Sequence, residues 1–160
     1  MSYSIRPAVP EDAQAITDMR WKLFEETHST TTPEPPPEFL DACRSAVTDS
    51  LAGGHAFAWL AVADRGAVVG NLVLLLYFRL PSPRNMVPTE GYVMNVYVEP
   101  AWRRRGIASA LMGAALDHAR ALGLGRVRLH ATDDGRQTYA RAGFLPREDG
   151  MELNLAPVRS

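Results

Sequence analysis

Three consecutive arginines and a glycine stand between a short apolar segment, residues 92–98, and a segment with helical periodicity. The first backbone N–H groups of a helix have no partners within it and lie at the positive end of its dipole, so a helix start attracts anions. Gly106 lets a ligand approach the main chain, and arginines donate charge-assisted hydrogen bonds to phosphate. Residues 103–108 are therefore predicted to bind a diphosphate, although a solvated charge patch is the alternative interpretation.

A second candidate is Tyr139, which stands four residues before the pair Gly143-Phe144. Taken alone, a tyrosine in a short helix is better explained by packing. The combination with the arginine-glycine turn about thirty residues earlier is more specific than either feature.

Together these features resemble the GCN5-related N-acetyltransferase (GNAT) superfamily, and the predicted order of elements agrees with it over essentially the whole chain. The residues that carry the resemblance are Pro100, Arg103-x-x-Gly106-x-Ala108 and Tyr139-x-x-x-Gly143-Phe144. The resemblance implies an α/β (α+β) fold with a mixed, mostly antiparallel sheet of six to seven strands, a splayed parallel pair and about four helices. It also implies acetyl-CoA as cosubstrate, no metal, and a small-molecule or peptide primary amine as acceptor.

The resemblance also implies which residues form the site. Main-chain groups of three residues in the central strand would bind the pantetheine arm, and the turn would hold the pyrophosphate. The implied cofactor-binding residues are Val96, Tyr97, Val98, Arg103, Arg104, Arg105, Gly106, Ile107, Ala108 and Ser109. Tyr139 would lie beside the cofactor sulfur and protonate the leaving thiolate, because a phenol pKa of ~10 is well matched to a thiol pKa of ~8.5.

Two positions depart from the family pattern. Thr132 stands where many members have an asparagine, and Tyr92 stands where some members have a glutamate that acts as general base. The base is therefore left open among Glu90, Glu99, Tyr92 and a histidine acting through water. For His130, on a predicted strand, a structural role is favoured over catalysis.

The single cysteine, Cys43, lies among apolar residues of a predicted helix and is interpreted as a small buried side chain. Direct transfer in a ternary complex is therefore preferred to an acetyl-cysteine intermediate. We expect the acceptor between the first two helices, the loop of residues 81–89 and the strand that begins at Glu90. A non-catalytic acyl-CoA binding or sensing module remains the alternative function.

Hydrophobic periodicity predicts the elements that position these residues. Helices are predicted at residues 10–28, 38–51, 107–122 and 136–141, and strands at 3–6, 56–63, 67–80, 92–98 and 126–132. The strands at 56–63 and 67–80 should form a hairpin whose second strand is central in the sheet, with a possible bulge at Gly70. The strands at 92–98 and 126–132 should be parallel because a helix connects them. A C-terminal hairpin is predicted to turn at Asp149-Gly150.

Side chains of the strand at 92–98 should alternate between the two faces of the sheet. One face should carry Tyr92, Met94, Val96 and Val98, and the other Val93, Asn95, Tyr97 and Glu99.

Length and composition limit the remaining possibilities. A chain of 160 residues, 46% of them apolar, is expected to form one domain over residues 1–160. Its net charge of −1, from 17 basic and 18 acidic residues, argues against nucleic acid or an anionic membrane as partner. The sequence predicts no membrane span and no secretory signal, so we expect a cytoplasmic protein. A homodimer formed through sheet edges or the C-terminal hairpin is plausible.

Overall fold

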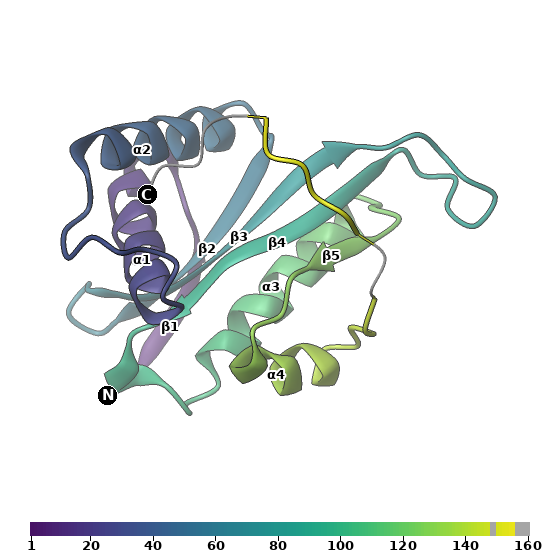
Figure 1. The fold of residues 1–160 in the computed structure, drawn as a ribbon. Helices are drawn as coiled ribbons and strands as arrows, with labels where there is room; N and C mark the ends of the chain where they lie inside the picture. Colours follow the sequence, from purple (N-terminus) through teal and green to yellow (C-terminus); the bar gives the residue numbers. More distant parts are fainter. Residues whose placement is uncertain (148–149, 156–160) are drawn as a thin grey trace.

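The computed structural model describes residues 1–147 and 150–155, which form a five-stranded sheet in the order β1-β2-β3-β4-β5 (Figure 1). The first four strands pair antiparallel, and β4 and β5 are parallel, as the connecting helix requires. The mixed α/β fold class is therefore confirmed, but the sheet has five strands among the described residues, where six to seven were predicted. The strands are β1 (Tyr3–Pro7), β2 (Ala56–Ala63), β3 (Val68–Phe78), β4 (Thr89–Val98) and β5 (Val127–Leu129).

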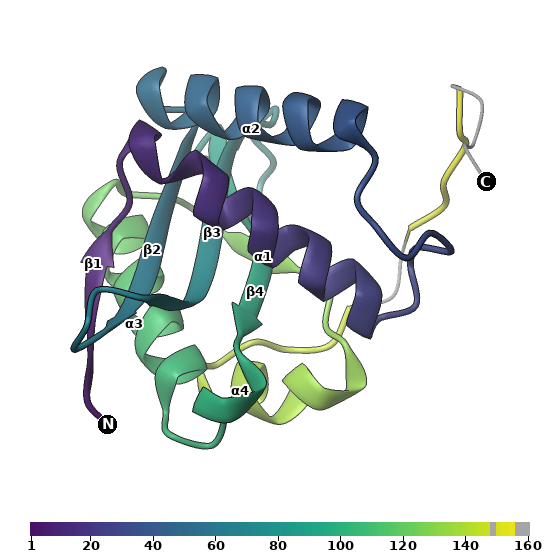
Figure 2. The same ribbon diagram turned by 90° about the vertical axis from the view of Figure 1, so that its left-hand side faces the viewer.

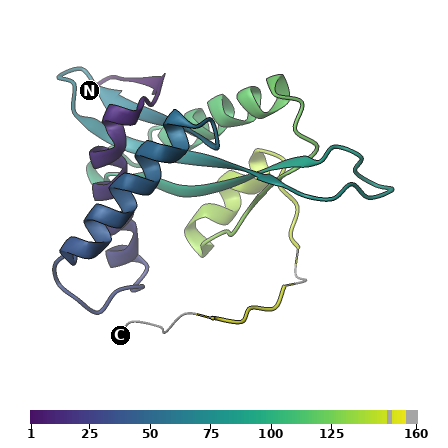
Figure 3. The ribbon, with the colours of Figure 1, turned by 90° about the horizontal axis from the view of Figure 1, so that it is seen from above.

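Helices cover both faces of this sheet, with α1 and α2 on one face and α3 on the other (Figures 2 and 3). The short helix α4 follows β5 and packs Tyr139 and Ala142 against the α3 side of the core. All four helices were predicted from the sequence to within about three residues. They are α1 (Ala13–Glu26), α2 (Pro37–Ala52), α3 (Ile107–Ala121) and α4 (Arg136–Arg141), with short 3-10 turns at Pro10–Asp12, Pro100–Trp102 and Asp133–Gly135.

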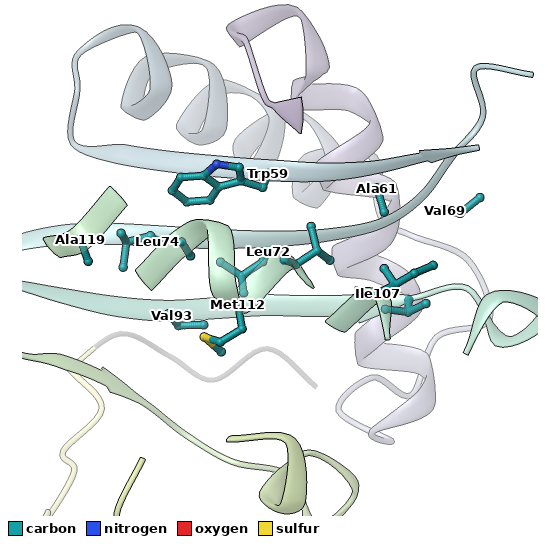
Figure 4. Packing of buried hydrophobic residues seen from close by; sticks show 12 residues of the cluster. Trp59, Ala61, Val69, Leu72, Leu74, Val93, Ile107, Met112 and Ala119 are labelled. Carbon is teal, nitrogen blue, oxygen red and sulfur yellow. The ribbon is translucent and has the colours of Figure 1, made fainter. Parts of the chain in front are cut away.

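The hydrophobic core has two layers, one on each face of the central strand β3. On the α3 side, Leu72 and Leu74 pack against Met112 and Trp59 (Figure 4). On the other side, Val73 packs with Ile16 of α1. The prediction of a central strand covered on both faces is therefore confirmed for residues 69–74, although the strand ends at Phe78 and not at Leu80.

A bulge interrupts the β2–β3 hairpin next to Gly70. Ala61 pairs with Gly70 and Val62 pairs with Val68, so Val69 has no opposing residue. A Cβ on Gly70 would lie 3.1 Å from the carbonyl oxygen of Tyr97 on β4, which is closer than packing readily allows. The predicted bulge is confirmed, and Gly70 permits the close approach of β3 and β4.

The C-terminal hairpin prediction is wrong for the residues that the structure describes. Residues 144–147 and 150–155 form no strand, and Asp149 of the predicted turn lies outside the described residues. The strand predicted at 126–132 is also shorter, because β5 ends at Leu129. An edge of three residues offers few backbone partners to a further strand. The apolar side chains that would have faced the core are exposed instead: Leu145, Met151, Leu153 and Leu155.

Within the described part of the chain, every helix is too short or too polar to cross a lipid bilayer.

Candidate active site

Strand β4 contains an extra residue where it crosses the middle of the sheet. Tyr97 pairs with Asn71 and Met94 pairs with Val73, so Asn95 and Val96 together oppose the single residue Leu72. Asn95 takes the left-handed conformation with φ 55°, which asparagine tolerates better than most residues. This is a β-bulge.

The prediction of which face each β4 side chain occupies is wrong after the bulge. Val96 and Val98 pack in the α3-side cluster together with Val93, whereas Met94 packs in the α1-side cluster. The sequence prediction had placed Val96 and Val98 on the face of Met94. Strict alternation fails here because one inserted residue shifts every later side chain to the opposite face.

Buried amide side chains hold the bulge in place. The Asn95 Nδ2 atom donates to the Asn71 Oδ1 atom at 2.7 Å and to the Ile16 carbonyl oxygen at 3.3 Å. The Asn71 Nδ2 atom contacts the Met19 Sδ atom at 3.3 Å. Sequence reasoning missed this network, although two asparagines within otherwise apolar strands were the available signal.

Strands β4 and β5 pair over only three residues and then separate. The last pair is Val93 with Leu129, so the edge of β4 that faces β5 is unpaired beyond that point within the described residues. A pocket of about 90 Å³ opens in this gap. Its lining residues are Leu23, Val93, Met94, Asn95, Val96, Leu129, His130, Thr132 and Tyr139.

Tyr139 is fixed at this pocket by the local fold of α4. Its carbonyl oxygen accepts the Phe144 N–H at 3.0 Å, and the two rings meet edge to face with centroids 6.2 Å apart. A Cβ on Gly135 would lie 2.6 Å from the Tyr139 ring, so a larger residue at this position would displace the ring. Burial raises the pKa of Tyr139, and the hydroxyl has no hydrogen-bond partner among the described residues. The phenol is therefore protonated at neutral pH and is available as a donor.

The arginine-glycine turn lies where β4 leads into α3, as predicted. Gly106 is the N-cap with φ 78°, and Arg104 also takes a left-handed conformation with φ 61°. The Ala110 N–H donates to the Gly106 carbonyl oxygen at 2.9 Å, which begins the helical ladder. The N–H groups of the residues just before Ala110 lack helical acceptors, so they can bind an anion.

Two of the three arginine side chains are used within the protein. The Arg103 Nε atom donates to the Val98 carbonyl oxygen at 2.8 Å, its guanidinium forms an ion pair with Glu26, and it lies over the Tyr97 ring. Arg105 lies 5.2 Å from the centroid of the Trp102 ring. Arg103 and Arg105 therefore shape the turn, which leaves its main chain and Arg104 to contact a phosphate.

Both carboxylates that were considered as the general base, Glu90 and Glu99, already have partners within the protein. Glu90 is only 1% exposed, and its carboxylate accepts hydrogen bonds from Tyr77 at 2.6 Å and Asn85 at 3.0 Å. Burial opposes ionisation of Glu90, but the Tyr77 hydrogen bond and nearby arginines outweigh it and lower the pKa. Glu99 forms an ion pair with Lys22. The lowered pKa makes Glu90 a weak base.

The structure instead brings Tyr92 and His130 together at the rim of the pocket. The Tyr92 hydroxyl forms a hydrogen bond with the His130 Nδ1 atom, and the His130 ring lines the pocket that also contains Tyr139. Burial raises the pKa of Tyr92, and an interaction with the main chain of His130 opposes this effect. The sequence interpretation favoured a structural role for His130. The sequence of residues 126–132 does not indicate that β5 separates from β4 after Leu129, which is what places His130 at the pocket.

Cys43 is only half-buried on α2, a helix without any fully buried residue. The prediction of a buried core cysteine is therefore wrong. Helix α2 packs on the sheet beside α1 and contacts β2, so its apolar side chains are covered from one side only. Cys43 is not among the residues that line the pocket between β4 and β5.

The comparisons with known proteins agree with this arrangement. The chain matches the family model of the acetyltransferase (GNAT) family over residues 14–144. No curated protein sequence matches it significantly. The fold is similar to a GCN5-related N-acetyltransferase from Ralstonia eutropha JMP134, with 27% identity, 97% and 100% of the two chains covered and a TM-score of 0.82.

Two further structures share the fold at lower identity. A predicted acetyltransferase from Clostridium acetobutylicum, solved with acetyl-CoA, is 22% identical, with 96% and 97% of the chains covered and a TM-score of 0.85. A ribosomal-protein-alanine N-acetyltransferase from Brucella melitensis biovar Abortus 2308 is 21% identical, with 97% and 100% covered and a TM-score of 0.68. Since the family model covers most of the sequence, this chain belongs to the GNAT acetyltransferase family.

Proposed function

We propose that this protein transfers the acetyl group of acetyl-CoA directly to a primary amine in a ternary complex. The observation that carries the proposal is the gap between β4 and β5, which has Tyr139 and His130 on its β5 side. The α3 helix start follows the end of β4, so a diphosphate and a reactive group can be bound along one strand.

The residues present fit acetyl-CoA on two structural grounds. The edge of β4 beyond Val93 is not paired with β5, so the main chain of Val96, Tyr97 and Val98 can bond the pantetheine amides as an added strand would. The main-chain N–H groups of residues 104–109 lie around Gly106, the N-cap of α3. Because Gly106 has no side chain, a pyrophosphate can approach these N–H groups. When bound, acetyl-CoA supplies an acetyl thioester as electrophile and a thiolate as leaving group.

Tyr139 is proposed as the general acid. The raised pKa keeps the proton on the Tyr139 Oη atom at neutral pH, and that proton can pass to a departing thiolate in the pocket. A main-chain N–H at the Val96 bulge can donate to a carbonyl oxygen on which negative charge develops.

The Tyr92–His130 pair is proposed as the base. A primary amine with a pKa of ~10 is protonated at neutral pH and must lose a proton before it attacks. His130 lines the same pocket as Tyr139 and can take that proton directly or through one water. The hydrogen bond between the Tyr92 Oη atom and the His130 Nδ1 atom fixes the orientation of the imidazole.

The test is thiol release from acetyl-CoA measured across a panel of amines that includes polyamines, amino acids, amino sugars and peptides. We expect release that depends on an acceptor and rises with its concentration. Tight acetyl-CoA binding with no release for any amine would contradict the proposal and support a non-catalytic acyl-CoA binding or sensing module.

A further inference from the structure

A cluster of charged side chains surrounds Glu90 on the sheet face opposite to α3. Glu90 on β4 pairs with Tyr77 on β3, and their side chains are hydrogen bonded. Three arginines approach the Glu90 carboxylate from neighbouring segments: Arg79 at 3.7 Å, Arg126 at 3.7 Å and Arg128 at 3.6 Å.

Glu90 does not use the hydrogen-bond donors of these arginines. Its two oxygens accept from Tyr77 and Asn85, and the arginine nitrogens lie beyond the 2.7–2.9 Å range typical of a charge-assisted hydrogen bond. Among residues 1–147 and 150–155, none of the three guanidinium groups has a hydrogen-bond partner. The Nε atom of Arg128 is moreover buried without one.

The cluster also carries an excess of positive charge. Three arginines face one carboxylate, although the whole chain has a net charge of −1. The side chains are 46% exposed for Arg79, 30% for Arg126 and 38% for Arg128, so each is partly covered and still reaches solvent. One arginine is enough to neutralise the buried carboxylate of Glu90. The charges of the other two arginines are therefore not balanced within the cluster.

This cluster adjoins the proposed reaction pocket. Arg128 precedes the pocket residue His130 by two positions on the same face of the β5 segment, which corresponds to ~7 Å of extended chain. Glu90 precedes the pocket residue Met94 by four positions on β4, or ~13 Å. In Figure 1 the hairpin of β3 and β4 extends past α1 and α2, and the Glu90 pair lies on this hairpin.

We propose that Arg79, Arg126 and Arg128 bind an anionic group of the acetyl acceptor, a carboxylate or a phosphate ester, held ~7 to ~13 Å from the reacting amine. The inference rests on the proposed function, because it assigns the acceptor side of the same pocket. It selects acceptors with an anion at this distance from the amine over simple alkylamines.

Calorimetric binding of two matched pairs of amines tests this inference without requiring turnover. Lysine and cadaverine differ only by the carboxylate, and glucosamine-6-phosphate and glucosamine differ only by the phosphate. We expect the anionic member of at least one pair to bind about tenfold more tightly, because it gains charge-assisted hydrogen bonds. The pair that shows the preference distinguishes a carboxylate from a phosphate.

Arginine variants test whether the preference for the anionic amine comes from this cluster. Arg79→Gln and Arg126→Gln should each reduce it to about threefold or less, because each removes a charged donor from the cluster. Arg84→Gln is the matched control, since Arg84 is an exposed arginine in the same β3–β4 connection and does not contact Glu90. It should keep the full preference. Thermal unfolding of each variant verifies that the fold is intact.

Equal or undetectable binding of the two members in both pairs would overturn the inference, as would an equal loss in Arg84→Gln. Thiol release from acetyl-CoA in the same samples separates it from the proposed function. Acetylation without a preference for the anion would refute only the acceptor assignment. A preference that depends on the arginines, without acetylation, would refute only the enzymatic role.

Discussion

At the scale of single residues, the proposed general acid is a tyrosine that the surrounding fold keeps protonated. Tyr139 is partly buried beside Phe144 and Gly135, and this burial raises its pKa. A raised pKa keeps the phenol protonated at neutral pH, so the proton is available for donation and almost no phenolate is present to accept one. The burial of Tyr139 is thus consistent with an acid and inconsistent with a base.

The variant Tyr139→Phe should lower kcat by about a hundredfold, because positioned general acids contribute on this order. The ring packing against Phe144 is retained, so the dissociation constant for acetyl-CoA should stay within about twofold. Steady-state thiol release and calorimetry measure the two quantities. An unchanged kcat would remove the acid role from Tyr139.

Glu90 gives a prediction about pH. Burial works against its ionisation, but Tyr77 and the arginines hold its folded pKa below the ordinary value of 4.5. A carboxyl with a depressed folded pKa stabilises the protein fully above the unfolded pKa, and this contribution disappears as pH falls through the folded one.

Glu90→Gln should therefore lower the Tm at neutral pH, and the difference from wild type should shrink as the pH falls below about 4.5. Thermal unfolding between neutral and acidic pH measures the effect. Glu152→Gln, at an exposed position, is the control and should leave the profile unchanged. A difference that persists undiminished in acid would show that the charge of Glu90 is not responsible.

Sequence reasoning could find Tyr139 and Gly106 because each stands at a fixed distance from other motif residues. It could not place His130 at the pocket or Asn95 at a bulge, since these positions depend on where two strands separate and where one strand gains a residue. The interpretation of Cys43 failed for a similar reason: an apolar helix face does not indicate whether the helix is covered from one side or from several.

At the scale of elements, the start of α3 should decide cofactor affinity. Gly106 and Gly123 lie at opposite ends of this helix, both with positive φ, at 78° and 71°. A valine at either position meets the same kind of backbone strain, so the two variants are matched for stability.

Gly106→Val should weaken acetyl-CoA binding at least about tenfold, because its side chain occupies the space that a pyrophosphate needs. Gly123→Val should leave the affinity unchanged, although both should lower the free energy of unfolding by ~1 to ~3 kcal/mol. Calorimetry and denaturant unfolding provide the two readouts. Equal affinity in the two variants would refute the pyrophosphate site.

The bulge of β4 depends on Asn95, which combines a left-handed backbone with a buried amide network. Asn95→Ala should destabilise the protein by ~2 to ~4 kcal/mol, from backbone strain and from the lost hydrogen bonds. Asn95→Gly relieves the strain and should recover ~1 kcal/mol of that loss. Urea unfolding measures both variants, and identical stabilities would show that the backbone conformation contributes nothing.

Most elements were predictable because their hydrophobic periods are long and regular, as in α3 and β3. The parallel pairing of β4 and β5 followed from the connecting helix. The short length of β5 was not predictable, because residues 126–132 alternate as well as those of a longer strand. The absence of strands at residues 144–147 and 150–155 was not predictable either. Strand β5 is short because it separates from β4 after the pair of Val93 with Leu129.

At the scale of the whole molecule, the two faces of the sheet differ in how completely helices cover them. Helix α3 closes one face with an apolar layer, while α1 and α2 cover only part of the other (Figure 3). The remaining area at β4 and β5 holds the pocket and the arginine cluster. A nearly neutral chain thus concentrates positive charge in one place, which total composition does not reveal.

The most direct test of the account is acetyl transfer from acetyl-CoA with a deuterated acetyl group to a mixed pool of amines. Mass spectrometry identifies the labelled amides, and thiol detection counts the turnovers. The account predicts labelled amides in amounts equal to the released thiol, for wild type and, about a hundredfold more slowly, for Tyr139→Phe. Bound acetyl-CoA without labelled amide, or equal rates in the two proteins, would contradict it.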